Sequence, residues 1–159
     1  MGCTAARTAD HGSIGVTGAL TKKKAPVGDP ARIAVQNAVL REGKAGNTAG
    51  MQALVDEFRS KFVEGPQEKA VFEVARAFAH YADGTSDAEL PLAWWIQPYP
   101  GNFGDWLSPL IVQHYSGGRV TLQPLTQVAR RQHMIALGSV GRFIKSNSVV
   151  FGTGISTED

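Results

Sequence analysis

Cysteine is almost missing from this sequence, since Cys3 is the only one in 159 residues. A single thiol cannot build a disulfide framework within the chain, and it cannot supply a cysteine-based metal site. The histidines nearest the candidate chemistry, His114 and His133, have no third ligand in view, so we predict no metal site. The low cysteine content indicates reducing conditions.

Long hydrophobic runs are missing too. No apolar stretch approaches the length that spans a bilayer, and the first residues lack the basic start and apolar run of a secretory signal. The start of the chain also fails the myristoylation pattern, because Ala6 stands where serine or threonine is needed. We expect no transmembrane segment and a location in the cytoplasm, where the lysine run Lys22–Lys24 would permit contact with the inner face of the membrane.

A strong charge of either sign is absent. The net charge of +2 is too small to indicate a nucleic-acid partner. The charge is unevenly spread, however, because residues 119–145 contain no aspartate or glutamate. This segment either attracts an anion, such as a phosphate or carboxylate, or forms a solvated basic face. Its arginines and lysine are Arg119, Arg130, Arg131, Arg142 and Lys145.

The nucleotide-binding and hydrolase motifs are missing as well. No phosphate loop of the form G-x-x-x-x-G-K-[ST] occurs, and Thr157 stands where a dinucleotide fingerprint starting at Gly152 needs its third glycine. The segment around Ser139 is no nucleophile elbow, because Leu137 occupies the position of the first glycine.

What is present predicts three parts: a disordered tail over residues 1–28, a helical segment over 29–84 and an α/β domain over 90–159. The chain length suits one domain with an appendage. Helices are expected from the Asp29-Pro30 start signal to Gly43, over 48–64, and from Gly65-Pro66 to about Asp83. Strands are expected at 92–97, 119–122, 133–137 and 148–151, and connections of this length imply parallel pairing. The fold class is therefore α/β, with an incomplete, parallel, Rossmann-like layer preceded by helices.

The stretch from Trp94 to Pro109 predicts a strand, a tight turn and a helix. Trp94 and Trp95 are adjacent, so on a strand they face opposite sides of a sheet that is covered on both. We expect Asp105 or Ser108 to cap the helix, with Pro109 in its first turn, where the missing N–H costs little. In open α/β sheets ligands bind at such a turn.

Polar and glycine residues at three strand ends form the candidate site. Asp105 could accept the proton of a sugar hydroxyl that Asn102 orients. Gly104, which has no side chain, would let the ligand come close to the backbone. Alternatively, Asn102 only shapes the turn and Asp105 only caps the helix. The carboxyl ends of parallel strands share one edge, so the later turns should converge on the same crevice, although glycines there could simply let strands turn. Those turns contain Ser139, Gly152, Thr153 and Gly154. Phe103 and Trp106 either stack on sugar rings or pack in the core.

Three segments of this region resemble the polysaccharide pyruvyl transferase family. Residues 101–109, GNFGDWLSP, resemble the family's N-[FWY]-G-D-x-L-[ST] opening motif. The segments HMIALGSV at 133–140 and NSVVFGTGI at 147–155 are similar to later strands of the family with their glycine ends, in the same order.

The resemblance implies the N-terminal lobe of a two-lobed, GT-B-like enzyme of exopolysaccharide biosynthesis. Such an enzyme transfers a pyruvyl group from phosphoenolpyruvate, its donor substrate, to saccharide hydroxyls as a ketal and needs no further cofactor. The family holds phosphoenolpyruvate largely through its second lobe, and this chain ends before that lobe and lacks its R-G-P segment. We therefore expect a truncated chain with little turnover alone, which self-associates or takes the second lobe from a partner. Two alternatives stay open: a non-catalytic saccharide-binding module, and a lobe of a sugar-nucleotide glycosyltransferase.

Overall fold

A computed structural model describes residues 28–154, so almost all of the predicted tail and the last five residues lie outside the described part. Three helices come first, followed by a segment in which strands and one helix alternate. The helices are α1 (Pro30–Lys44), α2 (Thr48–Lys61), α3 (Pro66–Ala82) and α4 (Phe103–Ser116). The strands are β1 (Glu89–Ala93), β2 (Arg119–Leu122), β3 (His133–Ile135) and β4 (Ser148–Val150), and a 3-10 turn, η1, spans Gly141–Phe143.

The sheet has four strands in the order β2-β1-β3-β4, and all of its pairs are parallel. The predicted α/β class and parallel pairing are therefore confirmed, and the strand order is compatible with a Rossmann-like fold. β1 was predicted at 92–97 but starts at Glu89 and ends at Ala93. The carbonyls of Ala88 and Leu92 accept hydrogen bonds from the β2 side, so the missing N–H of Pro91 faces the other side, where pairing with β3 begins only at Leu92.

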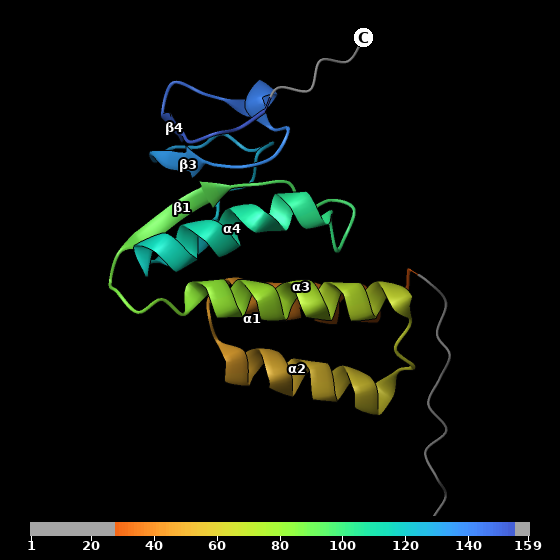
Figure 1. The fold of residues 1–159 in the computed structure, drawn as a ribbon. Coiled ribbons are helices and arrows are strands. Elements are labelled where there is room, and N and C mark those ends of the chain that lie inside the picture. Colours follow the sequence, from red (N-terminus) through yellow and green to blue (C-terminus); the bar gives the residue numbers. More distant parts are fainter. Residues whose placement is uncertain (1–27, 155–159) are drawn as a thin grey trace, which may run out of the picture.

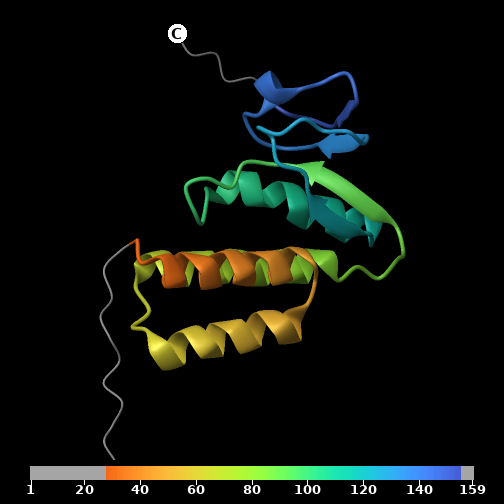
Figure 2. The same ribbon diagram turned by 180° about the vertical axis from the view of Figure 1, so that it is seen from behind.

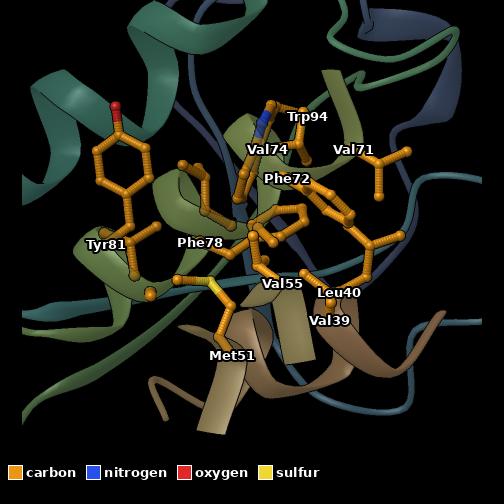
Figure 3. Packing of buried hydrophobic residues seen from close by; sticks show 14 of the residues in the cluster. Val39, Leu40, Met51, Val55, Val71, Phe72, Val74, Phe78, Tyr81 and Trp94 are labelled. Carbon is orange, nitrogen blue, oxygen red and sulfur yellow. The ribbon is translucent and has the colours of Figure 1, made fainter. Parts of the chain in front are cut away.

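The helical segment and the α/β segment share one hydrophobic core. α1 and α3 lie side by side with α2 beneath them, and α4 and the strands lie above this layer (Figures 1 and 2). Trp94, only 2% exposed, packs its ring 6.1 Å from that of Phe78 on α3. Figure 3 shows Trp94 above a cluster to which all three N-terminal helices contribute. The sheet is thus held on the helices by aromatic and aliphatic packing.

The opposite face of the sheet is covered by a smaller cluster of hydrophobic residues. Ala93 and Ile135 are buried there against Leu125 and Val140, which lie in loops. Trp95 joins this cluster and stacks on Phe143 of η1, with ring centroids 5.7 Å apart. The prediction that Trp94 and Trp95 serve opposite faces is confirmed, and loops with a short 3-10 turn cover the second face.

The predicted details of α4 were wrong. Its N-cap is Asn102, and Pro109 lies in its second turn inside the helix. The buried side consists of Asp105, Ser108, Pro109 and Val112, whereas Leu110 and Ile111 are exposed. The helix is capped by the side chain of Asn102, three residues before Asp105, the earlier of the two caps that the sequence predicted.

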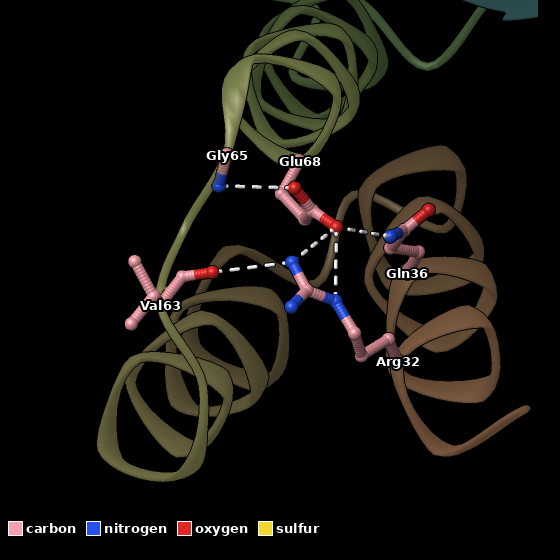
Figure 4. Close-up of polar contacts among 5 residues, drawn as sticks. All are labelled: Arg32, Gln36, Val63, Gly65 and Glu68. Carbon is pink, nitrogen blue, oxygen red and sulfur yellow. Dashed lines mark hydrogen bonds and ion pairs between the residues drawn. The ribbon is translucent and has the colours of Figure 1, made fainter. Parts of the chain in front are cut away.

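A buried ion pair joins α1 to α3 (Figure 4). Both Nε and Nη2 of Arg32 donate to Oε1 of Glu68, at 3.2 and 2.7 Å, and Gln36 donates to the same oxygen. The other carboxylate oxygen accepts the N–H of Gly65, and Arg32 also donates to the carbonyl of Val63. The charge of each partner is therefore met inside the protein. Among the described residues, no helix has the length and apolar character to cross a membrane.

Candidate functional site

A cavity of about 510 Å³ opens at the carboxyl edge of the sheet, between the turn that follows β1 and the turn that follows β3. β1 lies between β2 and β3, so the chain leaves β1 toward one neighbour and later returns to the other. Open α/β sheets bind ligands at such a reversal of strand order. We call this space the Asp105 cavity. Its lining includes Trp95, Asn102, Gly104, Asp105, Leu107, Leu137, Gly138, Ser139, Val140, Arg142 and Phe143.

Asn102 and Asp105 are joined by two reciprocal hydrogen bonds at the start of α4. Oδ1 of Asn102 accepts the backbone N–H of Asp105 at 3.0 Å, and its Nδ2 donates to Oδ2 of Asp105. Asp105 is 6% exposed. Its burial raises the pKa of the carboxyl, and the hydrogen bond from Asn102 offsets part of that rise. The result is an oriented carboxylate that takes up a proton more readily than an ordinary aspartate.

Gly138 brings the turn after β3 against this carboxylate. Its φ of +106° lies in the region that favours glycine, and a Cβ there would stand 2.9 Å from Oδ1 of Asp105. The hydroxyl of Ser108 donates to the carbonyl of Leu137 at 2.8 Å, which ties α4 to the same turn. The close approach of the two turns therefore requires glycine at position 138.

The turn after β4 lies behind Gly138. The hydroxyl of Thr153 donates to the Gly138 carbonyl at 2.8 Å, and the N–H of Gly154 donates to it at 2.9 Å. Ser139 is exposed and lines the Asp105 cavity. The structure thus brings Asn102, Ser139 and Thr153 to one edge, as the strand order predicts, with Thr153 and Gly154 supporting the cavity rather than lining it. Gly152 is an exposed turn residue with φ +71°.

The two aromatic residues proposed as sugar contacts lie elsewhere. Phe103 is 80% exposed and does not line the Asp105 cavity. Trp106 stacks 6.2 Å from Tyr81 and packs against Phe78, and its indole N–H donates to the carbonyl of Pro100. Trp106 is therefore a packing residue between α4 and α3.

Sequence reasoning did not single out several residues of the cavity wall, among them Trp95 and Arg142. Arg142 is exposed, and its guanidinium carbon lies 5.0 Å from the ring centroid of Phe143. It places a positive charge on the wall that also carries Asp105. The absence of acidic residues from 119–145 was a signal for such a cation, but it did not distinguish Arg142 from its basic neighbours. Lys145 instead donates to backbone carbonyls of the loop before β3.

His133 is a structural residue. It is 4% exposed, and its Nε2 lies 2.9 Å from the hydroxyl of Ser148, so it links β3 to β4. Within residues 28–154, no three side chains of histidine, cysteine, aspartate or glutamate gather where they could hold a metal ion.

Comparison of the chain with protein-family models, with curated proteins and with solved structures found no match.

Proposed function

We propose that the chain is a transferase similar to the polysaccharide pyruvyl transferases, which moves a pyruvyl group from phosphoenolpyruvate to two hydroxyls of a saccharide. The observation that carries this proposal is the buried carboxylate of Asp105, oriented by Asn102 at the switch point of the sheet. The proposal is also supported by the three segments that resemble the family, the first of which contains both Asn102 and Asp105.

The reaction forms two C–O bonds and breaks one. The two saccharide oxygens add to C2 of phosphoenolpyruvate, and the bond from C2 to the phosphate oxygen breaks. Of the two hydroxyl protons, one ends on C3, which becomes a methyl group, and the other leaves on the phosphate. Asp105 is proposed to accept a hydroxyl proton as the oxygen attacks, because a carboxylate with a raised pKa is the better base.

Two other residues complete this assignment. Arg142 supplies a cation on the wall of the Asp105 cavity that suits the carboxylate or phosphate of the donor. The exposed hydroxyl of Ser139 can hydrogen-bond a saccharide hydroxyl across from Asp105. The GT-B-like, two-lobed architecture of the family is part of the same proposal.

The test is phosphate release from phosphoenolpyruvate in the presence of methyl glucoside, whose 4- and 6-hydroxyls can close a six-membered ketal. The chain is assayed together with the second lobe of a polysaccharide pyruvyl transferase, because we expect little turnover from the chain alone. We expect release to require both substrates and to fall about a hundredfold or more in Asp105→Asn, which keeps the shape but removes the base. Asp87→Asn, an exposed aspartate outside the Asp105 cavity, is the matched control. Asp105→Asn with normal turnover would remove Asp105 from the mechanism.

Other outcomes distinguish the alternatives. Saccharide binding without phosphate release would favour a non-catalytic binding module. Binding or hydrolysis of UDP-glucose in preference to phosphoenolpyruvate would favour a sugar-nucleotide glycosyltransferase. If none of these ligands perturbs the NMR signals of Asn102 and Ser139, this edge of the sheet is not their binding site.

A further inference from the structure

A second pocket, of about 210 Å³, adjoins the Asp105 cavity at the same edge of the sheet. Trp95 lines both spaces, so the two are neighbours at this residue. We call the second space the Lys44 pocket. Its lining consists of Lys44, Trp94, Trp95, Ile96, Gln97, Tyr99, Leu122, Pro124, Leu125, Thr126 and Gln127.

The composition of this lining suits a sugar ring. Trp95 and Tyr99, both half-buried, supply aromatic surface, on which the C–H face of a pyranose can pack. Gln97 and Gln127 add amide groups, which both donate to and accept from hydroxyls. The buried indole N–H of Trp94 has no hydrogen-bond partner among the described residues. That N–H is itself shielded from solvent, so the donors open to a ligand are the amide groups of Gln97 and Gln127, which are exposed.

Lys44 gives the pocket a positive charge. It is the last residue of α1, and its ammonium lies 5.5 Å from the centroid of the Phe78 ring. No hydrogen bond or ion pair joins this ammonium to another residue in the described part of the chain. Partial burial lowers the pKa of Lys44, because desolvation disfavours the charged form. Lys44 is exposed, so an anion in the pocket would meet a positive charge that otherwise faces solvent and the Phe78 ring.

We propose that the Lys44 pocket binds the saccharide residue next to the one in the Asp105 cavity, and that it selects a sugar carrying a carboxylate. The identity of the neighbouring residue as a saccharide rests on the proposed function. A carboxylate fits better than a phosphate, since one ammonium and two amide side chains match a single charge, whereas phosphate sites commonly use the forked donors of arginine. The acceptor would accordingly be an acidic saccharide that extends along the carboxyl edge, past Trp95.

The experiment follows the indole N–H signals of the full chain, labelled with ¹⁵N-tryptophan, during titration with three probes. The chain has three tryptophans, so each signal can be assigned with one Trp→Phe variant. The probes are methyl glucuronoside, methyl glucoside and glucose 6-phosphate. We expect the Trp95 signal to move most, and methyl glucuronoside to bind about tenfold more tightly than methyl glucoside, which is the order of a single charge-assisted contact.

Variants at position 44 test the source of this preference. Lys44→Met should bring the Kd of methyl glucuronoside to that of methyl glucoside, while Lys44→Arg keeps the preference. Lys69→Met, on the exposed side of α3, makes the same change of charge outside the pocket and should have no effect. The two-dimensional amide spectrum of each variant shows that it is folded.

Several results would overturn the proposal: equal affinity for the acidic and neutral glycosides, a preference that survives Lys44→Met, or tighter binding of glucose 6-phosphate. The Kd of methyl glucuronoside is measured by binding alone, so it does not depend on phosphate release. Binding with the expected preference but without phosphate release would therefore reject the proposed reaction and keep the acidic-sugar site. Phosphate release without the preference would keep the proposed reaction and reject the acidic-sugar site.

Discussion

Glu68→Gln tests the buried ion pair between α1 and α3 with a change of one charge and almost no change of shape. In the native protein one carboxylate oxygen accepts hydrogen bonds from Arg32 and Gln36, and the other accepts the N–H of Gly65 at the start of α3. Glutamine keeps one acceptor but turns an N–H₂ group toward one of these donors. It also leaves Arg32, 6% exposed, without its carboxylate partner.

The expected cost is large. Removing one partner of a buried ion pair costs about 3–5 kcal/mol, because the other charge stays buried and uncompensated. Small domains have only about 5–15 kcal/mol of stability in total. The free energy of unfolding should therefore fall by about a fifth or more, measured by urea denaturation followed through tryptophan fluorescence. Arg32→Met combined with Glu68→Met should recover most of the loss, since two apolar side chains leave no unpaired charge.

Glu57→Gln is the matched control, because its partner Lys61 lies on the exposed side of α2. An exposed pair of this spacing contributes about 0.3–0.5 kcal/mol. If Glu68→Gln costs no more than Glu57→Gln, the buried pair does not hold α1 to α3 as described.

The same ion pair predicts how the stability of the protein changes at acidic pH. Burial alone would raise the pKa of Glu68, but the hydrogen bonds from Arg32 and from backbone N–H groups outweigh it, so the pKa is lowered. A carboxyl with a lowered pKa contributes stability that is fully present above its unfolded value, about 4.3, and is lost as the pH falls through the lower native value. The stability of the native chain should thus decline more steeply in acid than that of Glu68→Gln.

Three further predictions concern α4 and its neighbours. Gly138→Ala should lower the free energy of unfolding by about 1–3 kcal/mol, because alanine is strained at this φ, as urea denaturation would show. It should also abolish phosphate release in the release assay, because the added Cβ meets Asp105. Asn102→Ala should lower the free energy of unfolding by about 1 kcal/mol through loss of the helix cap. It should also raise the pKa of Asp105 further, because it removes the hydrogen bond that lowers this pKa, and a ¹³C titration of the carboxyl would detect the change. The exposed side of α4 and the apolar groove beside it should drive self-association, so Ile111→Lys should shift sedimentation toward a monomer, whereas a native chain that is already monomeric at high concentration would contradict this.

Local signals accounted for the elements that were predicted well. Asp29-Pro30 and Gly65-Pro66 mark the starts of α1 and α3 because capping and the fixed φ of proline act within one turn. α4 was harder, since Asn102, Asp105 and Ser108 are all good capping residues and the sequence does not rank them. The structure uses Asn102, the earliest of the three.

The site was predictable only where it follows from strand order. Asn102, Asp105 and Ser139 could be grouped because parallel strands end at one edge. Trp95 and Arg142 could not, because their positions depend on how the loops over the second face of the sheet close. For Trp106 the sequence left two alternatives, stacking on a sugar or packing in the core, because the direction of its ring depends on contacts with α3, which lies elsewhere in the sequence.

The three N-terminal helices are neighbours along the chain, whereas β1 must find partners much further on, with Leu92 paired to Met134. Local contacts form early in folding, and long loops close late because of the entropy they lose. We therefore expect the helices to collapse first and to present the apolar surface on which Trp94 and β1 settle, with β3 joining afterwards. The Asp105 cavity then forms in the final steps of folding. A ligand bound there would therefore slow the unfolding of the sheet more than that of the helices.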